Sequence, residues 1–161
     1  MKRDVRWRVA IPVTFFLVAL QPVLRAFPGG VFLPDFGLVL LFVFIPAVGA
    51  RSPWFSPALV FWVGVFRAGV SAVSPISSWA GFGLSLWLRR WVHRQVSPHS
   101  FFLRFGVGVL SAVPSTGMDA LAAIHWGVDL PPEVLWARCL GVGVLWAFFT
   151  RPASLRRGLG S

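Results

Sequence analysis

Three charged residues inside apolar stretches are the residues of this sequence best placed to do chemistry. Arg67, Asp119 and Arg138 each lie several residues inside a different apolar run. With a rise of about 1.5 Å per residue, all three lie roughly 9–11 Å below the same boundary of these runs. A lone charge in the middle of a membrane costs about 2.5–3.5 kcal/mol on insertion scales. We therefore expect Asp119 to pair with Arg67, Arg138 or both in a buried ionic cluster. This cluster would fix the order of helices or, alternatively, hold an ion or ligand.

Other catalytic or metal-binding patterns are weak. Ser115, Asp119 and His125 lie close in sequence, and a serine beside a histidine can form a nucleophile–base pair. However, Ser115 lies in a proline- and glycine-containing break, and no known triad order is matched. His93, His99 and His125 would fall on both sides of a membrane, which excludes a shared metal site. Since phosphate-loop and dinucleotide motifs are also missing, we predict no catalytic residue, no metal and no cofactor.

The composition indicates which kind of protein must position these charges. Of 161 residues, 57% are hydrophobic and 12% are charged, whereas soluble domains carry about 25% charged residues. The net charge of +10 is dispersed in small groups between apolar runs, which argues against a nucleic-acid interface. The single cysteine, Cys139, cannot form a disulfide within the chain. An integral membrane protein is the class that remains.

The apolar runs predict an all-α, polytopic membrane protein with one transmembrane domain over residues 1–161. The Pro114–Gly117 segment is expected to kink or open its helix. The 76–88 run is short enough to suit a re-entrant segment. The six expected transmembrane helices are 9–27, 36–50, 54–74, 76–88, 101–126 and 132–150.

The basic residues predict the orientation of these helices. Cytoplasmic loops are enriched in Lys and Arg. With six spans, both termini and the connections after the second and fourth spans fall on one side, and this side is strongly basic. The other side receives Arg25 together with three acidic residues. Both termini are therefore expected in the cytoplasm. The basic residues on the cytoplasmic side are Lys2, Arg3, Arg6, Arg8, Arg51, Arg89, Arg90, Arg94, Arg151, Arg156 and Arg157.

Two runs carry stripes of small residues at four-residue spacing, which places each stripe on one helix face. Small side chains allow close approach of helices in lipid. Packing within the bundle is the simpler interpretation, and docking of a partner helix is the alternative. The stripes are Gly64, Ala68 and Ala72 in the 54–74 run, and Gly108, Ala112, Thr116 and Ala120 in the 101–126 run.

The segment after the fourth run is interpreted as a cytoplasmic basic loop. It contains Arg89, Arg90 and Arg94. Ordinary orientation by positive charge explains this loop best. Contact with anionic lipid or with a cytoplasmic partner is the alternative.

The first half of the chain resembles a known family, the rod shape-determining MreD proteins. The resemblance covers roughly residues 9–95, and the second half agrees only in helix number and length. Members usually carry an acidic residue in the third span, where this chain reads Arg67-Ala68-Gly69. The residues that carry the resemblance are Pro34-Asp35-Phe36 with Leu38-Val39-Leu40-Leu41, then Gly64, Gly69, Ser74-Pro75 and Gly81.

This resemblance implies a non-enzymatic membrane subunit of the bacterial cell-elongation complex, located in the cytoplasmic membrane. Such a subunit scaffolds peptidoglycan synthesis and controls cell shape. The implied partners are an MreC-like bitopic protein, a RodA-type glycosyltransferase with a class B transpeptidase, MreB filaments and membrane lipid. No nucleic-acid partner is expected.

A second hypothesis is a substrate-binding subunit similar to the S-components of vitamin transporters. These are also small six-helix proteins, and they bind a ligand near the outer side, where Arg67, Asp119 and Arg138 are expected. They usually carry an Ala-x-x-x-Ala stripe in the first span. The first span here offers Ala10 and Ala19, which do not have that spacing.

Overall fold

The described part of the chain is all-helical. The computed structural model describes residues 7–45, 55–70, 73–96 and 100–150. Within these ranges there are six α-helices, one 3-10 helix and no strand. The elements are α1 (Trp7–Arg25), η1 (Gly30–Phe32), α2 (Phe36–Phe44), α3 (Phe55–Val70), α4 (Pro75–Gln95), α5 (Phe101–His125) and α6 (Pro132–Phe149).

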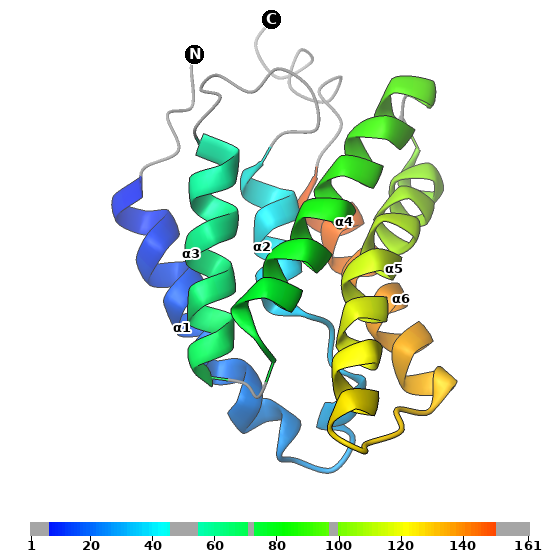
Figure 1. The fold of residues 1–161 in the computed structure, drawn as a ribbon. Coiled ribbons are helices and arrows are strands. Elements are labelled where there is room, and N and C mark those ends of the chain that lie inside the picture. The colour runs from blue at the N-terminus through cyan, green and yellow to red at the C-terminus, as the bar shows by residue number, and fades with distance from the viewer. Residues whose placement is uncertain (1–6, 46–54, 71–72, 97–99, 151–161) are drawn as a thin grey trace, which may run out of the picture.

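The helices alternate in direction along one bundle (Figure 1). The first turn of α1 and the last turn of α6 lie at the same end, which we call the tail end. The opposite end, where α1 ends and α2 begins, is called the turn end. Two of the helices, α5 and α6, are long and apolar enough to cross a membrane by length and composition.

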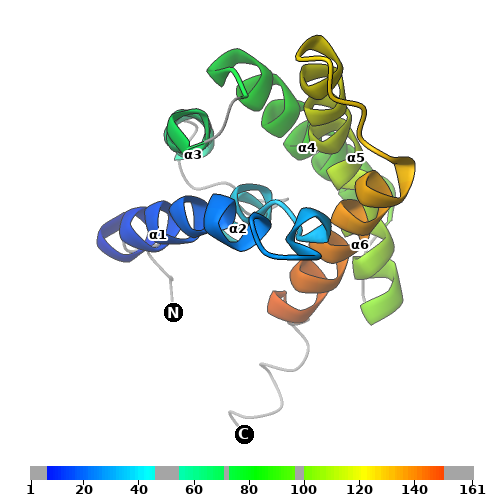
Figure 2. The same ribbon diagram turned by 90° about the horizontal axis from the view of Figure 1, so that it is seen from below.

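The short helix α2 lies at the centre of the bundle. It packs against α1, α3 and α6, and the view along the bundle shows it between α1 and α6 (Figure 2). Residues 37–42 are all buried, which explains why the sequence of this helix is apolar on every side. Because α2 has nine residues, it extends only about 14 Å. The expected 36–50 span is thus a helix to Phe44, and residues 46–50 lie outside the described part.

Local sequence signals explain where several helices begin. Ser74 caps α4 by accepting a hydrogen bond from the Ser77 N–H at 3.2 Å, with Pro75 in the first turn. Ser100 caps α5 in the same way. Serine is favoured at this position because its hydroxyl satisfies an N–H that has no partner within the helix, and proline fits the first helical position.

The end of α5 is fixed by a glycine. Gly127 has a φ of 70°, a left-handed conformation that glycine adopts without strain. The Val128 N–H donates to the Ala123 carbonyl, and the Gly127 N–H donates to the Ile124 carbonyl, both at 2.9 Å. These two bonds form a Schellman motif, which satisfies carbonyls that the end of a helix leaves free.

One expectation about helix continuity is wrong. The fourth helix does not end at Leu88 but continues to Gln95, and at 21 residues it is about 32 Å long. It is therefore not the short segment that the 76–88 run suggested. Helix α5 is not interrupted at the Pro114–Gly117 segment, and the expected kink at this position stays a prediction. There the Ser115 N–H donates to the Ser85 hydroxyl of α4 at 3.1 Å, so a neighbouring helix supplies an acceptor beside the proline.

Candidate functional site: a buried charge cluster

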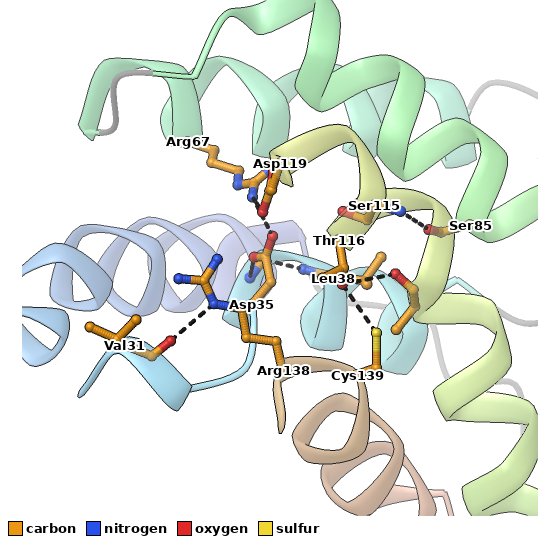
Figure 3. A network of polar contacts seen from close by, with 12 residues as sticks. Val31, Asp35, Leu38, Arg67, Ser85, Ser115, Thr116, Asp119, Arg138 and Cys139 are labelled. Carbon is orange, nitrogen blue, oxygen red and sulfur yellow. Dashed lines mark hydrogen bonds and ion pairs between the residues drawn. The ribbon is translucent and has the colours of Figure 1, made fainter. Parts of the chain in front are cut away.

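A guanidinium from α3 joins two carboxylates from other elements near the turn end (Figure 3). Arg67 Nη2 donates to Asp119 Oδ2 of α5 at 2.5 Å. The same nitrogen lies 2.9 Å from Asp35 Oδ2, just before α2. All three residues are buried. The expected pairing of Arg67 with Asp119 is therefore present, and the buried site also contains a second acid.

Asp35 was not expected in the cluster, because sequence reasoning counted it only among the acidic residues on the non-cytoplasmic side. It is the N-cap of α2, where Oδ1 accepts hydrogen bonds from the Gly37 N–H at 2.9 Å and the Leu38 N–H at 3.3 Å. A carboxylate at the N-terminus of a helix is favoured by both the free N–H groups and the helix dipole. Asp35 thus uses one oxygen to start α2 and the other to contact Arg67. The Pro-Asp pair before an apolar run was the available signal for this role.

Arg138 takes a different part from the one expected. It is buried in α6, and its Nε donates to the Val31 carbonyl at 3.0 Å. Within the described residues it forms no ion pair with Asp119 at 4 Å or less. Arg138 lies near the cluster, as its expected depth along the helix predicted. However, it binds the backbone of the segment between α1 and α2 instead of the Asp119 carboxylate.

Arg25, at the end of α1, is a further cation of this region. It is half-buried and interacts electrostatically with Arg138, Asp35, Asp119 and Arg67. Its Nε and Nη2 atoms are buried and have no hydrogen-bond partner among the described residues. Among the described residues, the cluster therefore combines three guanidiniums with two carboxylates, which leaves one excess positive charge when all five groups are ionised.

The suggested serine–histidine pair is not formed. Ser115 is buried between α4 and α5, and its Oγ has no hydrogen-bond partner in the described structure. His125 is exposed and lines an open groove of about 570 Å³ between the turn ends of α4 and α5. No group of three metal-ligating side chains occurs among the residues described, and His99 lies outside them.

The small residues of α5 pack mainly inside the bundle. A Cβ built at Gly108 would lie 2.9 Å from the Gly143 Cα of α6, so the two glycines allow a close backbone approach. Ala112 is fully buried, and the Thr116 hydroxyl accepts a hydrogen bond from the Cys139 thiol of α6 at 3.3 Å. Ala120 is half-buried. Packing against α6 thus accounts for Gly108 and Thr116 of this stripe.

The stripe of α3 is only partly used inside the bundle. Gly64 is buried, and the space beside it is filled by the Trp79 ring of α4. The Trp79 indole N–H donates to the Phe61 carbonyl at 3.2 Å. Ala68 is half-buried, and Ala72 lies outside the described residues.

The interpretation of the segment after the fourth span as a basic loop is wrong. Its residues Arg89, Arg90 and Arg94 belong to α4. Arg89 is 1% exposed. Its Nη1 donates to the Phe42 carbonyl at 2.7 Å, and its Nη2 donates to the Ile45 carbonyl. A cation at a helix C-terminus satisfies free carbonyls and interacts favourably with the dipole. Arg89 therefore caps the C-terminus of α2.

The other two arginines differ from Arg89 in exposure. Arg90 is half-buried and donates to the Ser56 hydroxyl of α3 at 3.1 Å, whereas Arg94 is exposed in the last turn. Spacing could have identified Arg89, because Ser78, Ser85 and Arg89 fall on one face of a continued helix. Counting charges instead placed it in a loop.

The chain was compared with models of protein families, with curated proteins and with solved structures. No match was found in any of the three comparisons.

Proposed function

We propose that the chain is a multi-pass protein of the bacterial cytoplasmic membrane with six spans and both termini in the cytoplasm. The alternating helices support this, since α1 begins and α6 ends at the same end of the bundle (Figure 1). Large apolar side chains are exposed on the outer faces of α1, α3, α4, α5 and α6, as expected where helices face lipid. Examples are Phe16, Trp62, Trp87, Phe102, Trp136 and Phe148.

Within this membrane, we propose a non-enzymatic subunit of the cell-elongation complex, similar to the MreD family. One observation carries the proposal: most of the residues that carry the resemblance have defined roles in the fold. Asp35 caps α2 and contacts Arg67. Gly64 accommodates Trp79 of α4, and Ser74 caps that helix. A Cβ at Gly81 would lie 3.1 Å from the Ser115 Cα where α4 crosses α5.

The proposed partners are an MreC-like bitopic protein, a RodA-type glycosyltransferase with its class B transpeptidase, and MreB filaments. The part of the α3 stripe around Ala68 is the candidate contact for a partner helix, because Trp79 covers Gly64 but Ala68 stays half-exposed. Small residues on an outward face permit the close approach that helix association in lipid requires.

Capture of the tagged full-length chain from native membranes, followed by mass spectrometry, tests this function. We expect a bitopic protein with a coiled coil, together with the synthase pair. Ala68→Leu should lower their recovery by steric exclusion, whereas Gly106→Leu should not. Gly106 is a matched control because a Cβ there meets nothing within 4 Å. Unchanged recovery with Ala68→Leu would remove α3 from the interface, and absence of these partners would refute the proposal.

The transporter-subunit alternative is favoured by one observation, the gathering of Arg25, Arg67, Arg138 and both acids near the turn end. With the proposed orientation, the turn end is the outer side, and S-components bind their ligand near the outer side. Depletion of the chain in its host discriminates the two functions. Rounded or widened cells that vitamin supplements do not rescue support the elongation subunit, and rescue by a vitamin supports the transporter subunit.

A further inference from the structure

The inner face of α1 carries three polar residues between positions 14 and 25. Thr14, Val18, Gln21 and Arg25 follow one another at spacings of four, three and four residues, which places them on one face of the helix. Thr14 and Gln21 are 1% and 5% exposed. This face is directed into the bundle, where α1 packs against α2 and α3. Apolar side chains would be expected at such positions, so the polar residues require a physical reason.

Several polar atoms on this face lack hydrogen-bond partners among the described residues. Gln21 Nε2 and the Nε and Nη2 of Arg25 are buried without an acceptor among the described residues. The two arginine nitrogens form one edge of the planar guanidinium, the fork that binds two oxygens of a carboxylate or phosphate at once. Gln21 adds a third donor one turn earlier on the same face. A buried donor left unpaired costs about 1–3 kcal/mol.

Each of the two nearby carboxylates contacts another guanidinium, that of Arg67, through one oxygen, and no ion pair of either acid with Arg25 at 4 Å or less occurs among the described residues. Asp35 contacts α2 with Oδ1 and Arg67 with Oδ2. Asp119 accepts from Arg67 through Oδ2, and its Oδ1 has no hydrogen-bond partner among the described residues. Because Arg138 is also buried close to Arg25, the region holds more positive than negative charge. An excess charge away from water is costly unless a counter-ion is bound.

We propose that the edge of Arg25 formed by Nε and Nη2, together with Gln21 Nε2, binds an oxyanion: a phosphate or carboxylate group. The group can belong to a lipid headgroup or to a free small molecule, because the donors recognise only its oxygens. With the proposed orientation, the site lies toward the outer leaflet. This inference does not depend on the elongation-complex proposal, since it rests on α1 and its buried neighbours alone.

The experiment measures thermal unfolding of the purified full-length chain in nanodiscs by tryptophan fluorescence. In the first arm, phosphatidylcholine nanodiscs are titrated with sodium phosphate or sodium acetate, with sodium chloride of equal ionic strength as reference. In the second arm, no anion is added, and phosphatidylglycerol replaces part of the phosphatidylcholine. We expect a saturable rise of the unfolding midpoint in at least one arm. A response in the first arm identifies a free anion, and a response only in the second identifies a lipid headgroup.

Three variants show whether the response belongs to this site. Arg25→Lys keeps the charge but loses the two-pronged geometry, so the concentration of anion or anionic lipid for half-maximal effect should rise about tenfold or more. Gln21→Leu should also raise the concentration of anion or anionic lipid needed for half-maximal effect. Arg94→Lys is the control, because Arg94 is exposed at the tail end of α4. Absence of a saturable rise in both arms would overturn the proposal, as would an equal response of wild type and Arg25→Lys. If Arg25→Lys does not fold, Gln21→Leu takes its place, and an equal response of wild type and Gln21→Leu would overturn the proposal.

Discussion

At the scale of single residues, Arg67 is a charge that connects three separate parts of the chain. It joins Asp35 before α2 and Asp119 in α5 from its place in α3. Charges in an apolar interior are tolerated when they are paired and hydrogen-bonded. Because one guanidinium serves two carboxylates, removing Arg67 leaves both acids unpaired, whereas removing Asp119 leaves Arg67 with Asp35. The two losses are therefore not equivalent.

This difference predicts the outcome of two double-mutant cycles. Asp119→Asn should destabilise the fold by about 1–3 kcal/mol, between the values for polar contacts in membranes and for buried pairs in soluble proteins. Its coupling to Arg67→Gln should exceed about 0.5 kcal/mol, the usual limit for independent sites. Coupling to Arg138→Gln should stay below that limit, because Arg138 binds the Val31 carbonyl. Chemical unfolding in detergent measures all three, and stronger coupling to Arg138 would contradict the geometry.

Arg89 gives a second prediction at the residue scale. It donates to the carbonyls of Phe42 and Ile45, and its guanidinium lies 4.8 Å from the centre of the Phe42 ring. Arg89→Met keeps much of the volume but leaves both carbonyls unpaired. We expect a loss of about 2–3 kcal/mol in the free energy of unfolding, since hydrogen bonds to charged groups contribute about 1.5–3 kcal/mol.

Arg94→Met is the matched control for Arg89→Met, because Arg94 is exposed in the same helix. Its effect should stay within about 0.5 kcal/mol, as for other surface substitutions. Equal effects of the two variants on the free energy of unfolding would show that Arg89 does not stabilise α2 through its C-terminal carbonyls. Arg89 would then be an ordinary basic residue at the membrane boundary.

At the scale of helices, glycines in α5 and just after it should respond to alanine in opposite directions. Gly127 has a positive φ, so Gly127→Ala should cost about 1 kcal/mol through backbone strain. Gly117 lies inside α5, and a Cβ there would meet nothing within 4 Å. Gly117→Ala should therefore stabilise the protein by about 0.5–1 kcal/mol. Thermal unfolding of the two variants side by side measures this, and a shared sign would contradict the Schellman ending of α5.

The sequence predicted elements better than it predicted contacts. Apolar runs located the six α-helices that the described residues form, because burial and lipid exposure both favour such runs. The end of the fourth helix was misplaced, since Arg89 and Arg90 were counted as loop charges although arginine is a good helix former. The pairing of Arg67 with Asp119 followed from depth along the helices. The part played by Asp35, and the binding of Arg138 to Val31, depend on how α2 and α6 pack, and spacing contains no information on that.

At the scale of the whole molecule, α2 is covered by protein while its neighbours face outward. Its residues 37–42 are buried, its start is fixed by Asp35 and its end by Arg89. A nine-residue helix is too short to cross a hydrocarbon core of about 30 Å by itself. Backbone that is not helical is tolerated at membrane depth only where protein or water covers it. The central position of α2 is thus consistent with a place inside a membrane bundle.

The proposed membrane orientation gives the last prediction. Asp129 is exposed between α5 and α6, and Ser154 lies beyond the end of α6. In a Cys139→Ala background, Asp129→Cys should react with an impermeant thiol reagent in intact spheroplasts. Ser154→Cys should react only after permeabilisation. The six-span arrangement requires these two different reactivities, because α6 crosses the membrane between positions 129 and 154. The basic tails place the C-terminal side of α6 in the cytoplasm. Wild-type Cys139 is the negative control, since its side chain is buried. Labelling of both introduced cysteines from the same side would exclude a crossing by α6 and with it the even number of spans.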